Sequence, residues 1–196
     1  MGRLRVHGAA TADALLVVAE RLVETEGVNA VTVRRVAEEA GTTTRAIYST
    51  FGTKDALLAA LGIRAFELLG AFVRRVALTD DPAADLVRVG AIAFRDFARR
   101  HTGLFRIGFD PVATPPQIWS EVAQVNAQAW QALLARIERL GLGRPIEPLA
   151  LQFHALCEGL AVNELRGTLG SPRAAKALWR QALTALVSGW TGTAAG

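Results

Sequence analysis

One segment near the N-terminus gathers side chains that could hydrogen-bond another molecule. It reads AGTTTRAIYSTFGTKDALLAAL over residues 40–61, with three threonines after a glycine, then an arginine, a tyrosine and a lysine. Beyond the cap, threonine is a poor residue for the first turn of a helix, because β-branching restricts its side chain. Hydroxyl and guanidinium groups both bond to base edges and phosphates. These residue types therefore point to recognition of nucleic acid.

The helices that position this segment can be predicted from apolar periodicity and capping residues. They run from about Thr11 to Glu26, from an N-cap at Thr32 to Gly41, from Thr43, and, after a cap at Thr53, from Lys54 to about Ala77. Only Gly41 and Thr42 separate the second helix from the cap of the third. Two short helices joined in this way form a helix-turn-helix pattern, whose second helix enters the major groove of DNA.

Four polar side chains face solvent on that second helix: Thr44, Arg45, Ser49 and Thr50. Arg45 is the most specific of them, because a guanidinium can bond guanine twice and discriminate against other bases by about 1–3 kcal/mol. Lys54 opens the next helix, where a cation opposes the helix dipole unless a phosphate is bound there. Arg34 and Arg35 repeat this arrangement, because they place cations in the first turn of the helix that Thr32 caps. The combination favours DNA binding.

The rest of the sequence is also helical, so the predicted fold class is all-α. One helix opens at Asp81 and Pro82 and closes at ARRHTG, a second runs from ATPPQIW to Leu140, a third spans RPIEPLALQFHALCEGLAVNELRG, and a fourth follows Ser171 and Pro172. The last two carry apolar seams: Leu149, Phe153, Leu156 and Leu160, then Ala174, Ala177, Leu178, Gln181, Ala182, Ala185 and Leu186. Paired across a two-fold axis, these seams predict a four-helix bundle and a homodimer.

Composition bounds the remaining possibilities. The chain has 196 residues, of which 51% are hydrophobic, so it can bury a substantial core. It has one cysteine, no long apolar stretch at the N-terminus and no run near 18 uninterrupted apolar residues, so we expect a cytoplasmic protein with no membrane partner. The net charge is +4, but residues 1–60 carry seven basic and seven acidic side chains, which argues against a DNA-architectural protein.

The stretch VNAVTVRRVAEEAGTTTRAIYSTFGTKDALLAAL resembles the N-terminal helix-turn-helix of the TetR family of bacterial transcriptional regulators. Within about Ala9–Leu61, the residues at the family's spacing are Gly27, Thr32, Val36, Ala37, Ala40, Gly41, Ile47, Tyr48, Phe51, Lys54 and Leu57. The resemblance implies a DNA-binding domain over 8–68 and a regulatory and dimerisation domain over 69–190. It also implies a homodimer that binds a palindromic operator in double-stranded DNA and responds to a small-molecule effector, with no cofactor and no catalytic role.

The resemblance also assigns roles to single residues. Thr32, Tyr48 and Lys54 are expected to contact phosphates, and Arg34, Thr44 and Arg45 to lie near bases. Thr43, Ser49 and Thr50 complete the expected DNA-binding set. The chain departs from the family pattern at Arg35, Arg45 and Ala46, where an acidic residue, a small residue and threonine are usual, so the operator sequence stays open.

The C-terminal half resembles the family more weakly. AFRDFARRHTGLFRIGF and LALQFHALCEGLAVNELRG resemble a TetR subgroup named for a Trp-His-Gly motif, where this chain has Cys157, Glu158 and Gly159. Its expected ligand-binding residues are Phe66, Phe72, Phe94, Phe97, Phe105, Phe109, Trp119, Trp130, Phe153 and Cys157. For any one aromatic, core packing is the commoner use, and the family resemblance is what makes a pocket the expectation. We expect a mostly apolar effector that releases a repressor, with Arg95, Asp96, Arg106 or Glu158 as an anchor for a polar end; activation stays open.

His154, Cys157 and Glu158 support an alternative hypothesis of another class. They fall at i, i+3 and i+4 on one helix face, so they could ligate a metal or form a Cys-His pair in an enzyme. A structural zinc site needs a fourth ligand, and His7 and His101 lie in unrelated segments. The sequence has no Gly-rich phosphate loop and no Ser-centred elbow. A buried cysteine beside a histidine is the simpler interpretation.

Overall fold

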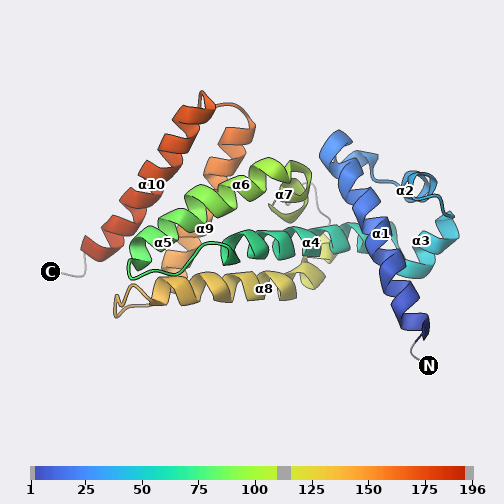
Figure 1. Cartoon of the computed structure of the whole chain (residues 1–196), viewed down its shortest axis with the longest axis horizontal. Coiled ribbons are helices and arrows are strands. Elements are labelled where there is room, and N and C mark those ends of the chain that lie inside the picture. Colours follow the sequence, from blue (N-terminus) through green and yellow to red (C-terminus); the bar gives the residue numbers. More distant parts are fainter. Residues whose placement is uncertain (1–2, 110–115, 193–196) are drawn as a thin grey trace. The chain divides into compact units, whose positions relative to one another are not determined.

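The structure is a computed structural model that describes residues 3–109 and 116–192, with side chains for residues 11–109 and 127–192. Every regular element in these ranges is a helix, which confirms the all-α prediction (Figure 1). The elements are α1 (Arg3–Glu26), η1 (Val28–Ala30), α2 (Val33–Glu39), α3 (Thr44–Phe51), α4 (Lys54–Arg74), α5 (Pro82–Arg88), η2 (Val89–Phe94), α6 (Arg95–Arg100), α7 (Thr102–Phe109), α8 (Pro116–Glu138), α9 (Glu147–Leu165) and α10 (Pro172–Gly192).

The chain forms two compact units. The first comprises Met1–Phe66 and His101–Val125, and the second comprises Glu67–Arg100 and Asn126–Gly196. Helix α4 contributes to both, since the division falls after Phe66. The first unit therefore contains α7 in addition to the helix-turn-helix.

In the first unit, α1, α2 and α3 share an apolar core that fixes the orientation of α3. Leu15 and Leu22 of α1, Val36 of α2 and Ile47 of α3 are each at most 2% exposed. Leu15, Ala19 and Leu22 of α1 are spaced four and three residues apart, which is the periodicity that the sequence showed. The buried side of α3 is narrow, so most of its side chains remain outside the core.

The tight turn between α2 and α3 depends on Gly41. Its φ of +64° lies in the left-handed region that favours glycine. The Thr42 amide donates to the Ala37 carbonyl at 2.9 Å and the Gly41 amide to the Glu38 carbonyl at 3.2 Å, so the last carbonyls of α2 are satisfied in a Schellman motif. Thr43 then caps α3. This local chemistry is what the sequence predicted for the turn.

Helix α7 packs on α1 and was not predicted as a separate helix. The Glu24 carboxylate accepts hydrogen bonds from the Gly103 amide at 2.8 Å and the Leu104 amide at 3.1 Å, at the start of α7. A carboxylate there is stabilised by the helix dipole. Gly103 lies so close to α1 that an added Cβ would be 2.6 Å from the Val23 carbonyl oxygen. The partners are distant in sequence, so no local pattern revealed the contact.

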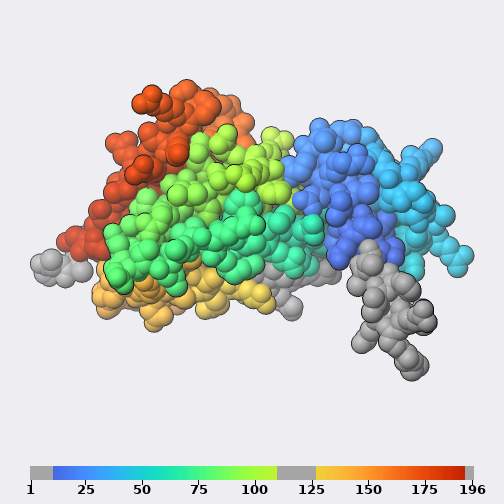
Figure 2. All heavy atoms as spheres, viewed as in Figure 1, coloured from blue at the N-terminus to red at the C-terminus, as the bar shows by residue number. Residues whose placement is uncertain are grey.

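The second unit contains a helical run in which the π-helix η2 lies between α5 and α6. Gly90 in η2 is packed closely, because an added Cβ would lie 2.5 Å from Leu183 Cδ1 of α10 and 3.0 Å from Cys157 Sγ of α9. Helix α10 packs along α5 and η2, and Figure 2 shows their side chains side by side. Apolar periodicity predicted one helix here but gave no sign of the π-helix.

A buried ion pair joins α6, α9 and α10. Arg95 is 5% exposed and donates to both carboxylate oxygens of Glu164, at 2.9 and 2.6 Å. Trp179 donates to the same carboxylate at 2.7 Å. Arg95 thus holds helices together, and its suggested role as the anchor of an effector is not supported.

The seam expected on α9 is wrong in its orientation. Leu149, Phe153 and Leu160 are 5%, 2% and 9% exposed, so they pack inside the protomer. The exposed side of α9 carries Leu151, Ala155 and Gly159 instead. Apolar residues occur around most of this helix, so periodicity alone did not identify the outer side. The exposed residues expected on α10, including Ala177 and Ala185, do lie at the surface.

Helix α4 is the only described helix that is long and apolar enough to cross a bilayer. Its Leu57, Leu61 and Ala65 are 0% exposed because they pack against other parts of the protein. A core helix satisfies the same length and composition test.

Candidate nucleic-acid interface

The candidate DNA contacts are all exposed: Thr32, Arg34, Thr43, Thr44, Arg45, Tyr48, Ser49, Thr50 and Lys54. They lie at the starts of α2 and α4 and along α3 (Figure 1). On α3 the contrast between neighbours is sharp, since Ile47 is 0% exposed and Tyr48 is 54% exposed. Helix α3 therefore buries one face and leaves a polar face with one aromatic ring open to a partner.

The hydroxyl groups of this set divide by the bonds that they make. Thr32 Oγ1 accepts from a backbone amide of α2 at 3.2 Å, and Thr43 Oγ1 accepts from one of α3 at 3.3 Å. Thr50 Oγ1 donates to a carbonyl one turn earlier at 2.8 Å. Thr44 and Ser49 have no hydrogen-bond partner for their side chains within the described residues. Two threonines thus fix the helix starts, and Thr44 and Ser49 keep their hydroxyls for another molecule.

Arg45 and Lys54 are the basic members of the set whose side chains have no partner among the residues that the structure describes. Neither side chain has a hydrogen bond or ion pair with the residues that the structure describes. Arg34 does have one, because its Nε donates to Glu38 at 2.9 Å, but both side chains are mostly exposed. An exposed i,i+4 pair contributes only about 0.3–0.5 kcal/mol, so DNA could displace it.

Arg35 has a structural explanation that does not involve DNA. Its Nη1 donates to Glu26 of α1 at 2.7 Å and its Nε to Glu39 at 3.2 Å. Arg21 of α1 also pairs with Glu39. These pairs cross-link α1 and α2 and balance the cation at the start of α2. Position 35, where the family usually has an acidic residue, thus carries an arginine that bonds acidic side chains nearby. The spacing of residues in the sequence did not reveal these ion pairs.

The candidate effector residues fall in both units. Phe66, Phe105 and Phe109 belong to the first, where Phe109 lies 5.2 Å from Phe66 and 4.9 Å from Phe105 between ring centroids. The second holds Phe72, Phe94, Phe97, Trp130, Phe153 and Cys157. Phe72 and Trp130 are half-buried, and the others are buried. The side chain of Trp119 lies outside the described residues.

His154 lies among aromatic rings, a placement that the sequence did not predict. Its ring centroid is 6.4 Å from that of Phe94 and 6.0 Å from that of Trp130, both edge-on. Burial lowers the pKa of His154, and Glu158 at 3.6 Å offsets this only in part. The imidazole is therefore neutral at pH 7 and can both donate and accept a hydrogen bond.

The metal or enzyme alternative is not favoured by this geometry. Cys157 is buried, and burial raises the pKa of its thiol far above neutral pH. Metal ligation and nucleophilic attack both use the thiolate, which this site disfavours. Among the residues that the structure describes, no group of three or more His, Cys, Asp or Glu side chains could hold a metal ion.

Two family models match the sequence. The model of bacterial regulatory proteins of the tetR family matches residues 15–61. The model of the Tetracyclin repressor-like C-terminal domain matches residues 87–186, about half of the chain. No curated protein matches the sequence. The Trp-His-Gly subgroup stays a prediction.

Solved structures share the fold over most of their length. A protein of unknown function from Rhodococcus sp. RHA1 is 24% identical, with a TM-score of 0.79 over 91% of this chain and 94% of that chain. The TetR family regulator PfmR from Thermus thermophilus is 20% identical, with a TM-score of 0.63 over 89% and 97%. The ketosteroid regulator KstR2 of Mycobacterium tuberculosis is 20% identical, with a TM-score of 0.60 over 91% and 93%.

The two matched regions include the exposed, capped α3 and the helical C-terminal part. The chain therefore belongs to the TetR family and is a ligand-responsive, DNA-binding transcriptional regulator.

Proposed function

We propose that the protein is a homodimeric repressor that binds a palindromic operator and is released from it by a mostly apolar small molecule. The observation that carries the DNA-binding part is the exposed guanidinium of Arg45 on α3, which has no partner among the described residues. A side chain of this kind in the major groove bonds guanine and selects sequence. The DNA-binding domain spans residues 8–68 and the regulatory domain residues 69–190.

The proposed contacts divide into those that position the protein on the DNA backbone and those that recognise bases. Thr32, Tyr48 and Lys54 hold phosphates, and the start of α4 at Lys54 suits an anion because its amides and the helix dipole attract negative charge. Thr44 and Arg45 read bases, with Arg34 beside them after exchange of its surface ion pair. Ser49 adds a hydroxyl to the same face, and Thr43 and Thr50, whose hydroxyls also bond the backbone of α3, complete the set.

An apolar effector is supported by the aromatic candidates, none of which supplies a full charge. Two structural neighbours are named for regulation connected with apolar compounds: KstR2, a ketosteroid regulator, and FadR from Bacillus halodurans, a fatty acid degradation regulator, which is 14% identical with a TM-score of 0.73.

The effector acts through α4, a continuous helix from Lys54 to Arg74, by changing the spacing of the two recognition helices. That spacing must match about 34–36 Å or a multiple of it for successive major grooves. The protein works in the cytoplasm and without catalysis.

The test combines operator selection with two substitutions. In vitro selection of bound DNA should return a palindrome. Arg45→Ala should then relax preference at one base pair per half-site, by about 1–3 kcal/mol. Lys54→Ala should weaken binding to all sequences alike and reduce the slope of log affinity against log salt by about 1 per contact. Arg173→Ala, at an exposed position of α10, is the matched control. Unchanged sequence preference in Arg45→Ala would exclude Arg45 as a reader.

A further inference from the structure

A groove of about 580 Å³ lies in the second unit between α5, η2 and α10. Apolar side chains line part of it: Val87 of α5, Ala91 and Ile92 of η2, and Val187 of α10. Ile92 is 49% exposed although it is a large aliphatic residue. None of the candidate effector residues whose side chains the structure describes lines the groove, so it is separate from that aromatic set.

The rim of the groove is positively charged. Arg88, Lys176 and Arg180 line it, and Asp81 is the one acidic residue among the described residues that line it. The Asp81 carboxylate caps α5, because it accepts a hydrogen bond from the Ala84 amide at 2.9 Å. The groove therefore combines apolar walls with an excess of cations.

Arg88 is held in place by the buried carboxylate of Asp85. That carboxylate also accepts from Arg139 at 2.8 Å, so one negative charge is shared between two guanidiniums. Positive charge is left over at this end of the groove. The Asp85 pairing thus orients a cation without neutralising the cluster.

Lys176 and Arg180 add two further cations, four residues apart on α10. Like charges at this spacing repel each other, and neither has an acidic partner among the described residues. An anion between them would remove the repulsion. Thr184 and Ser188 supply hydroxyl groups further along the same side of α10.

The geometry points to a binding site for an amphipathic organic anion, a carboxylate with an unbranched alkyl body. The alkyl chain lies against Val87, Ala91 and Ile92, and the carboxylate bonds to Lys176 and Arg180. The volume falls within the range of about 300–1,000 Å³ that is usual for small-molecule sites. The site is additional to the effector binding proposed above.

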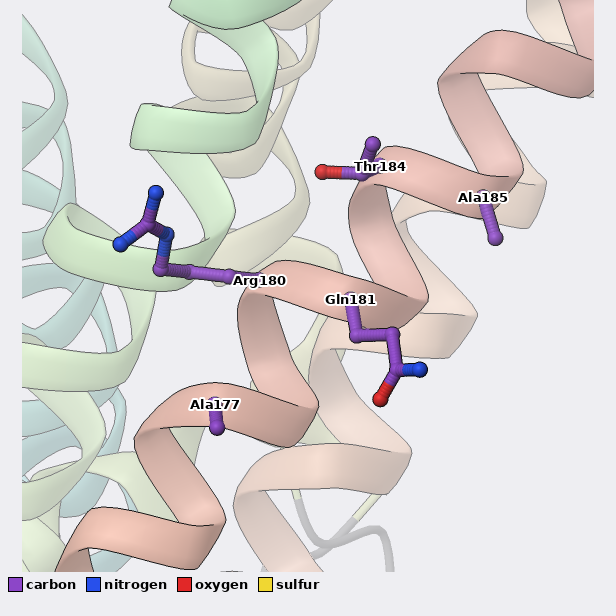
Figure 3. Close-up of a pocket in the computed structure, with 5 residues that line it drawn as sticks. All are labelled: Ala177, Arg180, Gln181, Thr184 and Ala185. Atoms are coloured by element: carbon purple, nitrogen blue, oxygen red, sulfur yellow. The ribbon is translucent and has the colours of Figure 1, made fainter.

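The dimer proposed for this chain uses an adjacent side of α10, which meets the groove at Arg180 and Thr184. Figure 3 shows Arg180 extending from α10 toward the light green ribbon, whereas Gln181 and Ala185 point to the opposite side. Arg180 and Thr184 also border a shallow hollow with Ala177, Gln181 and Ala185. A second copy seated on Ala177 and Ala185 would leave the α5 side of Arg180 open to a ligand.

The test uses decanoate and the full-length protein in isothermal titration calorimetry. Decanoate should bind, and decanol, with the same body and no charge, should bind at least about tenfold more weakly. Lys176→Gln and Arg180→Gln should each weaken decanoate binding about tenfold, since a bond to a charged group contributes enough for a factor of that size. Arg173→Gln, also exposed on α10, is the matched control and should bind as the unchanged protein does.

A photoreactive decanoate analogue gives an independent readout of the location. Labelled peptides should come from α5, η2 and α10. The proposal is overturned if decanoate does not bind, if both glutamine variants bind it with unchanged affinity, or if labelling occurs only elsewhere. Operator binding is measured separately, so a failure here leaves the proposed repressor function untouched, and failure to select an operator leaves this site untouched.

Discussion

Asp85 is a carboxylate that is 1% exposed, and its neighbours decide its charge. Burial acts to raise its pKa, but the amide and hydroxyl of Thr79 and the guanidiniums of Arg139 and Arg88 outweigh burial and leave the pKa well below its ordinary range. Asp85 is therefore ionised at pH 7. It ties the loop after α4 to α5 and to the end of α8.

Asp85→Asn should lower the urea midpoint of unfolding at pH 7. The folded pKa is depressed, so the stabilisation by Asp85 is fully present above the unfolded pKa of about 3.9 and is lost as pH falls through the folded value. The difference in free energy of unfolding between the two proteins should thus shrink below about pH 4. Asp80→Asn, in the same loop and exposed, is the control. A difference that stays constant from neutral to acidic pH would contradict this account.

At the scale of elements, α7 is joined to α1 by a close approach. The Glu24 carboxylate satisfies the Gly103 and Leu104 amides, and the side of Gly103 lies against the Val23 backbone. Because backbone atoms are in the way, a methyl group at residue 103 can be accommodated only if the two helices separate.

Gly103→Ala should lower the free energy of unfolding by about 1–3 kcal/mol or more, as expected for overpacking against atoms that cannot rotate away. Gly189→Ala is the control, since an added Cβ at this position meets no described atom within 4 Å beyond its chain neighbours and the backbone of α10. That control should be neutral or stabilising by up to about 1 kcal/mol, because alanine favours helix over glycine. Thermal and urea unfolding, followed by circular dichroism, distinguish the two. Equal stability of the two variants would show that α1 and α7 are not closely packed.

At the scale of the whole molecule, the question is how two copies assemble. The exposed side of α10 carries Ala177, Gln181 and Ala185, and that of α9 carries Leu151 and Ala155. Small side chains let helices approach closely. A four-helix bundle formed from these faces fits the proposed homodimer, with α9 rotated relative to the prediction from sequence.

Ala185→Glu should convert the dimer to a monomer in sedimentation velocity at micromolar concentration. The substitution places a charge in an apolar interface, where it is costly unless it is paired. Ala132→Glu, at an exposed position of α8, should remain dimeric. A monomeric unsubstituted protein, or a dimeric Ala185→Glu variant, would contradict this interface.

Local chemistry allowed much to be predicted from the sequence. Thr43 caps α3 and Gly41 forms the turn because each acts on backbone groups within a few residues, so the sequence alone determined the helix-turn-helix. Its spacing also sufficed to indicate the family. The candidate DNA contacts are exposed, and their roles remain predictions.

Only the tertiary structure decided which distant residues meet. Glu24 accepts hydrogen bonds from amides of α7, Arg35 donates to Glu26 of α1, and Arg95 of α6 pairs with Glu164 of α9. Each interaction joins helices that are separate in the sequence. The outer side of α9 was likewise undetermined, because apolar residues surround most of that helix. Caps and turns depend on neighbours along the chain, whereas burial and ion pairs depend on which helices pack together, and that is settled only when the whole chain has folded.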